Sequence, residues 1–511
     1  MTMRPIDLDN LTMDGVRGGS LAGRPVTVLG LARSGIALAR FLADAGARVT
    51  VYDGRAAADL GPAIGELGDR SIELRLGSDT DPASTWADAA LVATSPSINP
   101  DYPTTEPRLR GQLQALVARR AGGDVTAPAL VSEADLFLRL CPAPTIGVTG
   151  TKGKTTTSAL AHAILAADPA YPAVLGGNIG TPLIERLPGL TPDHRVVIEL
   201  SELQLPTLSR GTTVAVYTNV TSDHLDRHGS IDAYRRVKRR LAELVDPTGA
   251  LVLNVGDPVV AGYTGLGTAR EVPYRDDRPV SGGLGVIDDW IVAPAVERLP
   301  IAGGGTAATG PDGRIMTVAE LTIPGRHNVS NALAAIAAGL LFGVEPGAIR
   351  RAAAAFTGVE HRLQTVALVD GVRFVNDSQG TQPDAVIAAL RAFPPPVVLI
   401  AGGRDKGVDL TTLARVAAET IDAAVLIGES GPKLEGLLRD AGVERTTRAD
   451  TLDAAVSAAD GLARNALARR PTGSIATVLL SPAAASFDMF EDYAARGRAF
   501  IAAVGRLAEG R

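Results

Sequence analysis

Short apolar runs alternate with helical patterns along most of the chain. An apolar run at residues 26–30 is followed by a helical pattern at 36–45 and a second apolar run at 48–52. This succession is typical of a parallel sheet covered by helices. Similar alternations begin near residue 145 and near residue 372. The pattern therefore predicts an α/β protein with three sheet-containing parts.

Two breaks in the pattern suggest where these parts meet. Proline and glycine interrupt the chain at 121–129, and Thr357-Gly358 follows the helical pattern of 346–356. We expect a Rossmann-like domain at 1–131, a central P-loop ATPase domain with a parallel sheet at 132–357, and a Rossmann-like domain at 358–511.

Two segments fall outside these main patterns. Residues 1–22 contain acidic side chains and no apolar run, so they read as a loose leader rather than a signal peptide. Residues 250–322 are strand-like but interrupted by glycine and proline, which predicts a small accessory β layer in the central domain.

Composition narrows the possible partners. The length of 511 residues suits about three domains, and a net charge of −6 offers no basic surface for nucleic acid or anionic lipid. Cys141 is the only cysteine, which excludes disulfides within the chain. No apolar run reaches membrane-spanning length. We expect a cytoplasmic monomer with no nucleic-acid or membrane partner.

The stretch 144–157, PTIGVTGTKGKTTT, combines a β-branched run, spaced glycines and the start of a helical pattern. Glycines let backbone N–H groups turn toward a phosphate, and a helix N-terminus adds partial positive charge. Lys154 would reach the terminal phosphates and the Thr155 hydroxyl would bind Mg²⁺. Val148 replaces a glycine of the strict motif, and a purely structural glycine turn is the alternative. ATP binding is the prediction we prefer.

A second glycine turn, at Gly30–Gly35, follows the first predicted strand, and Asp53 ends the next strand. A turn and an acidic residue in this arrangement are typical of nucleotide-binding βαβ units. Ala32 stands where dinucleotide sites have a second glycine. The turn therefore favours a nucleoside-diphosphate ligand over NAD, although such turns are often merely structural.

A metal site is predicted beside the phosphate loop. The strand at 195–199 ends at Glu199, and the strand at 214–218 leads to a loop that contains His224. Parallel strands deliver such ends to one edge of a sheet. Each residue alone is more often solvated or unliganded than bound to a metal.

The helical pattern after Ser230 carries one lysine, Lys238, within its apolar stripe. A buried lysine costs desolvation unless it snorkels, pairs or is chemically altered. Burial lowers the pKa of lysine, and a neutral amine can react with CO₂ to form a carbamate. A carbamate would be an anionic metal ligand near His224, whereas snorkelling is the simpler alternative.

In the C-terminal part, four predicted strands end in polar loops that should share one sheet edge. Asp377, Lys406 and Ser486 lie in three of these loops. Together they resemble an anion pocket.

In combination, these stretches resemble the Mur ligases of peptidoglycan synthesis, and most closely the branch that joins glutamate to UDP-N-acetylmuramoyl-L-alanine. They follow the family order across all three expected domains. The matching stretches are Thr149–Thr156, Gly177–Gly180, Glu199–Ser201, Asn219–Arg227, Gly325–Asn328, Glu360–Arg362, Asn376–Ser378 and Leu480–Ala483.

The resemblance implies a role for each matching residue. The UDP-substrate set is Gly30, Ser34, Asp53, Arg55, Ser95 and Asn178. The ATP set is Gly150, Thr151, Lys152, Gly153, Lys154, Thr155, Thr156, Asn328, Asn331, Arg362 and Asp377. Two Mg²⁺ ions would be organised by Thr155, Glu199, His224 and a carbamylated Lys238, and the catalytic set is Lys154, Glu199, His224 and Lys238. The amino-acid set is Thr381, Lys406, Ser486 and Tyr493.

The expected reaction is ATP-dependent addition of D-glutamate through an acyl phosphate. Two departures from the branch bear on it: Lys152 replaces an asparagine, and Gln379-Gly380 replaces lysine-alanine. The second departure removes a cation near the amino-acid site. It leaves L-glutamate, another Mur ligase reaction and folylpolyglutamate synthesis open as alternatives. From other classes, an NAD-dependent dehydrogenase and a non-catalytic nucleotide-binding regulator also stay open.

Overall fold

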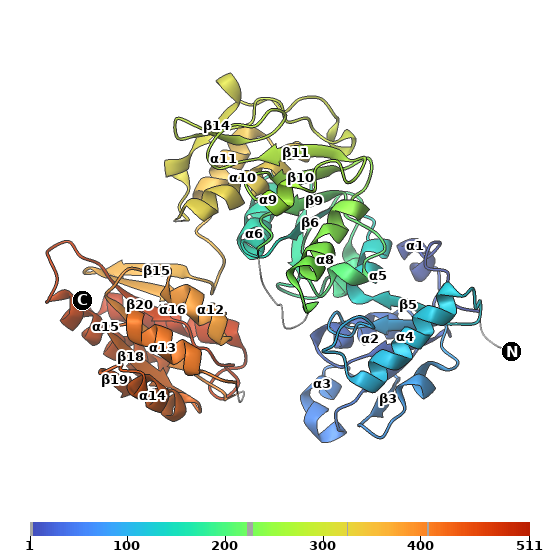
Figure 1. The fold of residues 1–511 in the computed structure, drawn as a ribbon, viewed down its shortest axis with the longest axis horizontal. Helices are drawn as coiled ribbons and strands as arrows, with labels where there is room; N and C mark the ends of the chain where they lie inside the picture. The colour runs from blue at the N-terminus through green and yellow to red at the C-terminus, as the bar shows by residue number, and fades with distance from the viewer. Residues whose placement is uncertain (1–3, 222–227, 324, 406–407) are drawn as a thin grey trace. The chain divides into compact units, whose positions relative to one another are not determined.

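The structure is a computed structural model, and it describes residues 4–221, 228–323, 325–405 and 408–511 (Figure 1). Its contacts divide the chain into two compact units, Met1–Phe356 and Thr357–Arg511. Within the described residues, no helix is both long and apolar enough to cross a membrane.

The first sheet of the N-terminal unit has five parallel strands in the order β3-β2-β1-β4-β5. The strands are β1 (Pro25–Leu29), β2 (Arg48–Asp53), β3 (Ile72–Leu76), β4 (Leu91–Thr94) and β5 (Ala129–Ser132). Its main helices are α2 (Arg33–Asp44), α3 (Gly61–Gly65) and α4 (Pro107–Ala121). β1 lies between β2 and β4, and its alternate residues pack into two different cores, Val26 and Val28 into one and Leu29 into the other. Its carboxyl end therefore lies in the middle of one sheet edge.

The prediction of a loose leader at 1–22 is wrong for the described residues. A short helix, α1 (Met13–Arg17), starts at Thr12, whose Oγ1 accepts a hydrogen bond from the Gly15 N–H at 3.1 Å. The Ile6 N–H also donates to the Ala90 carbonyl, at 2.9 Å. Sparse apolar side chains pack this segment into the core without forming a recognisable run: Leu11, Met13, Val16 and Leu21.

The second sheet of this unit has six parallel strands in the order β11-β10-β9-β6-β8-β7. The strands are β6 (Thr145–Thr149), β7 (Ala173–Gly177), β8 (Arg195–Glu199), β9 (Val214–Tyr217), β10 (Ala250–Asn254) and β11 (Arg270–Tyr274). The helices are α5 (Glu133–Leu140), α6 (Lys154–Leu165), α8 (Ile231–Leu244), α9 (Pro258–Ala261), α10 (Arg326–Leu341) and α11 (Pro346–Ala355).

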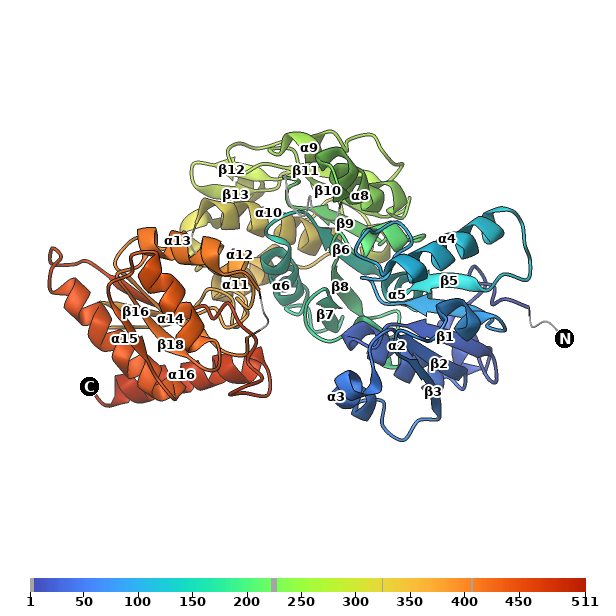
Figure 2. The ribbon, with the colours of Figure 1, turned by 60° about the horizontal axis from the view of Figure 1, so that its bottom comes forward.

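Alternate strand residues build the two faces of this sheet. Val197 and Val216 pack into the core that contains α6 and α10, whereas Val196, Ile198 and Tyr217 pack into the core on the other face. Figure 2 shows α6 and α10 beside each other against the sheet. The burial of both faces explains why these strands are apolar throughout.

The accessory β layer is smaller than predicted. Residues 250–254 and 270–274 are strands of the main parallel sheet, because their buried β-branched residues continue its apolar surface. The separate layer is a three-stranded antiparallel sheet of β12 (Gly285–Ile287), β13 (Trp290–Val292) and β14 (Arg314–Thr317).

The C-terminal unit contains one six-stranded sheet in the order β15-β16-β20-β17-β18-β19. β15 is antiparallel to β16, and the remaining pairs are parallel. The strands are β15 (Gln364–Val369), β16 (Val372–Asn376), β17 (Val397–Gly402), β18 (Ala423–Ile427), β19 (Thr446–Arg448) and β20 (Ala476–Leu480). One face packs on α12 (Pro383–Leu390), α13 (Thr411–Thr420) and α14 (Gly431–Asp440), and the other on α15 (Leu452–Leu467) and α16 (Tyr493–Glu509).

The predicted α/β class is therefore confirmed, including the parallel sheets and the small β layer. The division of the N-terminal unit at residue 131 stays a proposal. Its first sheet extends to Ser132, and α5 begins at the next residue.

Candidate active site

The loop between β6 and α6 has the backbone shape of a phosphate cradle. Gly150 and Gly153 have φ values of +147° and +84°, which disfavour residues with a side chain. A Cβ at Gly150 would overlap the Thr218 hydroxyl, and one at Gly153 would overlap the Asn331 side chain. Gly153 provides no side-chain cap for α6. The first N–H groups of this helix are thus suited to bind an anion.

The end of β9 holds this loop in place. The Asn219 carbonyl accepts from the Thr151 N–H at 2.7 Å, and the Asn219 Oδ1 accepts from the Lys152 N–H at 2.9 Å. The Thr218 hydroxyl donates to the Lys152 carbonyl at 2.6 Å. Lys154 Nζ folds back over the loop, donating to the carbonyls of Thr151 (2.8 Å) and Gly150 (3.1 Å).

Several other residues predicted to bind ATP lie near the loop. Thr155 is buried and Thr156 half-buried in the first turn of α6. Asn331, which packs against Gly153, donates from its Nδ2 to the Asn328 Oδ1 at 3.0 Å. The structure therefore brings the α10 asparagines to the phosphate loop.

Glu199 ends β8, which is the neighbour of β6 in the sheet. Its side chain is buried, and its Oε1 accepts from the Asn178 Nδ2 at 2.9 Å. Among the described residues, its Oε2 has no hydrogen-bond partner. A buried carboxylate oxygen without a hydrogen-bond partner is suited to bind Mg²⁺, because hard cations prefer carboxylate oxygens as ligands.

Only some of the residues predicted to bind Mg²⁺ lie within the described ranges. No group of three or more His, Cys, Asp and Glu residues that could hold a metal occurs within the described ranges. His224, another predicted ligand, lies outside the described residues. Thr155, Glu199 and Lys238 are therefore the members of the predicted metal set that lie within the described residues.

Lys238 is fully buried, as its position in the apolar stripe of α8 predicts. Its Nζ donates to the Gly150 carbonyl at 2.9 Å and to the Thr149 Oγ1 at 3.4 Å. It also lies 5.5 Å from the Tyr234 ring centroid, and the Tyr234 hydroxyl is 2.9 Å from the Thr151 Oγ1. The amine is thus in contact with the phosphate loop and does not snorkel to solvent.

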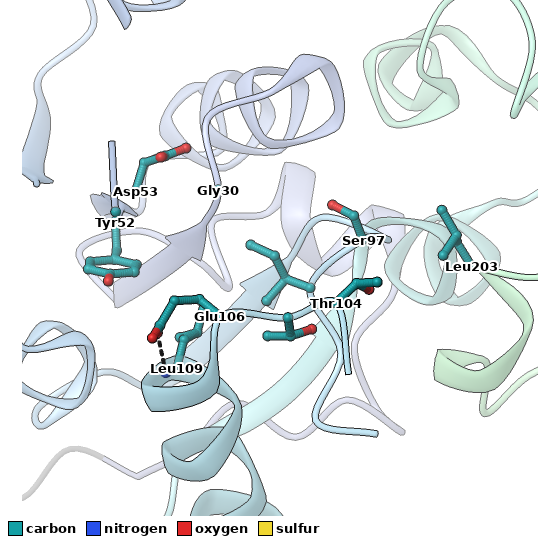
Figure 3. Close-up of a pocket in the computed structure, with 11 residues that line it drawn as sticks. Gly30, Tyr52, Asp53, Ser97, Thr104, Glu106, Leu109 and Leu203 are labelled. Carbon is teal, nitrogen blue, oxygen red and sulfur yellow. Dashed lines mark hydrogen bonds between the residues drawn. The ribbon is translucent and has the colours of Figure 1, made fainter. Parts of the chain in front are cut away.

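A pocket of about 350 Å³ opens at the carboxyl edge of the first sheet (Figure 3). Gly30, with φ of +89°, forms part of it, and a Cβ there would lie 2.8 Å from the Ile98 Cδ1. Tyr52 and Glu106 lie on one side of the pocket and Leu203 on the other. The lining residues are Gly30, Tyr52, Asp53, Gly54, Ser97, Ile98, Thr104, Thr105, Glu106, Leu109 and Leu203.

Asp53 stabilises the turn as well as lining the pocket. Its carboxylate accepts from the Leu31 N–H at 2.8 Å and from the Arg55 Nε and Nη2 at 3.0 and 2.8 Å. Burial raises the pKa of Asp53, but the hydrogen bonds from Arg55 and from the backbone outweigh burial and hold the pKa below its ordinary value. Ser95 is buried beside Gly30, and Ser34 is half-buried in the first turn of α2.

In the C-terminal unit, Asp377 follows β16 and is buried. Burial raises its pKa to about 6, although hydrogen bonds from the Ser481 hydroxyl (2.6 Å) and the Leu363 N–H (3.2 Å) oppose the shift. Arg362 carries a charge that also opposes it. Arg362 therefore lies close enough to Asp377 for its positive charge to affect the pKa of the Asp377 carboxyl.

Three of the four predicted amino-acid residues, Thr381, Ser486 and Tyr493, lie within the described residues. Ser486 is buried, and Tyr493 is half-buried with its carbonyl accepting from the Ser378 hydroxyl at 2.8 Å. Thr381 is half-buried in the loop after β16. Lys406 lies outside the described residues.

The sequence did not predict the buried Arg496 or the pocket residues Tyr52 and Glu106. Arg496 was detectable, since it shares an apolar stripe of α16 with Phe500, as Lys238 does on α8. For the pocket residues no comparable pattern exists. Their contribution depends on how β1, β2 and α4 are arranged in space.

The chain matches two family models, Mur ligase middle domain at residues 148–339 and Mur ligase, glutamate ligase domain at residues 361–483. A UDP-N-acetylmuramoylalanine–D-glutamate ligase of Symbiobacterium thermophilum is 36% identical over 482 residues, covering 94% of this chain and 97% of that protein. The ligase of the same name from Geotalea uraniireducens is 37% identical, covering 96% of this chain and 99% of that protein.

A solved structure supports the fold. UDP-N-acetylmuramate-alanine ligase MurC from Thermotoga maritima aligns with a TM-score of 0.50 at 20% identity, covering 95% of this chain and 100% of that chain. The two family models together span the phosphate loop, Glu199 and the C-terminal sheet, and the relatives are similar over nearly their full length. The chain belongs to the Mur ligase family.

Proposed function

We propose that this protein is an ATP-dependent ligase that joins D-glutamate to UDP-N-acetylmuramoyl-L-alanine in the synthesis of peptidoglycan precursors. The observation that carries the proposal is the phosphate loop with buried Glu199 and Lys238 beside it, in a chain whose relatives bear that ligase name. A dehydrogenase would not need this arrangement.

The chemistry requires activation of a carboxylate, which is a poor electrophile. The substrate carboxylate attacks the γ-phosphorus of ATP, giving an acyl phosphate and ADP. The amine of glutamate then attacks the acyl carbon, the C–O bond to phosphate breaks, and phosphate leaves while the amine loses a proton. The products are the amide, ADP and phosphate.

The residues of the phosphate loop would bind and orient ATP. Backbone N–H groups of Gly150–Gly153 and the first turn of α6 would hold phosphate oxygens, and Lys154 would exchange its loop carbonyls for the terminal phosphate. Thr155, Glu199 and His224 would hold Mg²⁺, which neutralises phosphoryl charge when bound. We assign Asn328, Asn331, Arg362 and Asp377 to ATP as well.

We further propose that Lys238 is carbamylated and that two Mg²⁺ ions are bound. The Lys238 amine would add to CO₂, forming an N–C bond and releasing one proton. The resulting carbamate keeps one N–H that can donate to the Gly150 carbonyl. Full burial and contact with the loop support this assignment. An anionic lysine derivative there would complement the cations.

The carbamate can be detected directly. Protein equilibrated with ¹³C-bicarbonate should show a carbamate carbon signal that is absent in Lys238→Ala and present in Arg239→Ala, which changes an exposed residue of the same helix. Lys238→Ala should also lose most ligase turnover. A silent ¹³C spectrum for the active wild type would refute carbamylation.

The remaining assignments place the substrates. Gly30, Ser34, Asp53, Arg55 and Ser95 would hold the UDP part in the pocket of Figure 3, with Asn178 facing the substrate near Glu199. Thr381, Lys406, Ser486 and Tyr493 would bind glutamate. Three domains, a monomeric state and a cytoplasmic location complete the proposal.

The decisive assay measures phosphate release and product with UDP-N-acetylmuramoyl-L-alanine, ATP and each glutamate enantiomer separately. We expect release that requires the UDP substrate and D-glutamate and that is lost in Lys154→Ala. Phosphate release indifferent to both substrates would contradict the proposal. A preference for L-glutamate would instead select the alternative raised by Gln379.

A further inference from the structure

Arg496 is the largest side chain that the described part of the protein buries completely. It lies in the first turn of α16, and burial lowers the pKa of its guanidinium to about 10. Its four hydrogen-bond acceptors are neutral oxygens, and the negative charge of Asp488 opposes the lowering of the pKa only in part. Burying a cation in this way is costly, and apolar side chains often replace buried charges without loss of stability. Stability alone therefore does not account for an arginine at this position.

The guanidinium joins two loops that are far apart in sequence. Nε donates to the Ser378 hydroxyl and Nη2 to the Ser378 carbonyl, both at 3.0 Å. Nη1 donates to the Ala485 carbonyl and Nη2 to the Ala484 carbonyl, both at 3.2 Å. One planar group thus fixes the loop after β16 relative to the loop after β20.

A third loop packs against the same group. The Arg404 N–H donates to the Ala485 carbonyl at 2.9 Å, and a Cβ at Gly403 would lie 3.1 Å from the Arg496 Nη1. The Ser378 hydroxyl, which accepts from Arg496, donates in turn to the Tyr493 carbonyl at 2.8 Å. The loops at the carboxyl ends of β16, β17 and β20 therefore meet at Arg496.

These loops lead directly to the residues assigned to the amino-acid substrate. Ser486 follows Ala485, Thr381 lies three residues after Ser378, and Tyr493 shares the first turn of α16 with Arg496. Since four hydrogen bonds engage the guanidinium with the protein, Arg496 acts on the substrate through these neighbours.

We propose that Arg496 is a positioning residue that aligns Ser378 and the 484–486 loop so that the C-terminal unit can bind the incoming amino acid. The inference rests on the proposed ligase function. It predicts that damage at Arg496 appears first in the KM for glutamate, because the residues assigned to glutamate adjoin the groups that Arg496 holds. Asp377, which is assigned to ATP and precedes Ser378, has its carboxylate held separately by the Ser481 hydroxyl and the Leu363 N–H.

The test compares Arg496→Met and Arg496→Lys with Arg498→Met, which changes an exposed arginine of the same helix. In Arg496→Met we expect the KM for glutamate to rise by at least about tenfold, the factor for loss of one or more hydrogen bonds to a charged group. The KM for ATP should change less than about twofold. Arg496→Lys should be intermediate, and Arg498→Met should match the wild type.

Chemical rescue separates positioning from folding. Arg496→Ala leaves a cavity, and guanidinium at millimolar concentration should lower the KM for glutamate in this variant but not in the wild type. If Arg496→Met is too unstable to assay, the lysine variant and the rescue carry the test.

The inference fails if the wild type ligates glutamate while all Arg496 variants keep its KM for glutamate, or if only kcat falls, or if guanidinium rescues nothing. Failure of the wild type to ligate glutamate would instead overturn the proposed function. The two failures are therefore distinguishable.

Discussion

Several of the ionisable side chains that are buried in the described part of the protein lie next to loops at the carboxyl ends of strands. Lys238 contacts the loop after β6, Glu199 ends β8, and Asp377 follows β16. Backbone groups that are not used in a strand or helix are available there to offset the cost of burial. Glu133, which directly follows β5, is a further example.

Glu133 predicts a pH dependence of stability. Burial raises its pKa to about 7, and a hydrogen bond from the Ile184 N–H and the charge of Arg33 oppose the shift only in part. The folded state therefore holds the proton more tightly than the unfolded state, whose pKa is near 4.5. Folding stability from this group is fully present below about pH 4.5 and is lost as pH rises to 7.

Replacing Glu133 by glutamine should remove the loss of folding stability that ionisation of this carboxyl causes as pH rises. Between pH 4.5 and 7, the variant should become more stable relative to the wild type, by up to roughly 3 kcal/mol for a shift of this size. Urea unfolding at pH 5, 6, 7 and 8 measures the difference. Glu444→Gln, at an exposed position, should show no such trend. A difference that does not vary with pH would exclude Glu133 as its source.

At the scale of elements, α8 shows how the start of a helix determines which side chain contacts the phosphate loop. Ser230 starts the helix, with its Oγ accepting from the Ala233 N–H at 3.2 Å. Two turns later, the helical period brings Lys238 to the buried face with Tyr234 and Leu241. The cap fixes where the helix begins, so it also fixes which residues face the phosphate loop.

Ser230→Ala should therefore destabilise the N-terminal unit by about 1 kcal/mol, the usual cost of a lost N-cap hydrogen bond. Ser230→Asp should preserve stability because aspartate caps helices equally well. Thermal unfolding followed by circular dichroism compares the three proteins. Equal melting temperatures for serine and alanine would show that the cap does not stabilise α8.

The segment before β1 supplies a second element-scale prediction. Because residues 11–21 bury apolar side chains and Arg139 donates to the Leu8 carbonyl at 2.9 Å, deletion of residues 1–22 should lower stability. Burying even two such side chains contributes roughly 3–6 kcal/mol. A deletion variant that unfolds at the wild-type urea concentration would favour the loose leader expected from the sequence.

At the scale of the whole molecule, ligand binding should couple to unfolding. If ATP and Mg²⁺ bind the folded N-terminal unit, a ligand concentration of about 100 Kd should stabilise it by roughly 2.7 kcal/mol. Differential scanning fluorimetry should show a higher melting temperature when ATP and Mg²⁺ are both present. Adding EDTA should abolish this increase. Glu199→Gln should reduce the increase in melting temperature that depends on Mg²⁺. A rise that is unaffected by EDTA would argue against the metal role of Glu199.

The sequence by itself determined the α/β class, the phosphate loop and the position of Lys238 in the apolar stripe of its helix, whereas the structure decided between burial and snorkelling of that side chain. These features depend on local spacing: glycines before a helix, apolar runs of strand length, and a helical period that places position 238 among apolar neighbours. Such patterns involve residues that are close in the chain, so backbone geometry alone relates them to structure. These patterns did not predict that residues 4–22 are ordered and partly buried, because the apolar side chains of this segment are too sparse to form a pattern.

Only the tertiary structure decided which distant groups meet. It brought Asn178 to Glu199, placed Tyr52 and Glu106 in one pocket, and brought Arg496 to Ser378, 118 residues earlier. These contacts depend on the order of strands in each sheet and on how helices pack across it. Spacing along the chain does not encode that order, because many topologies can accommodate the same succession of strands and helices.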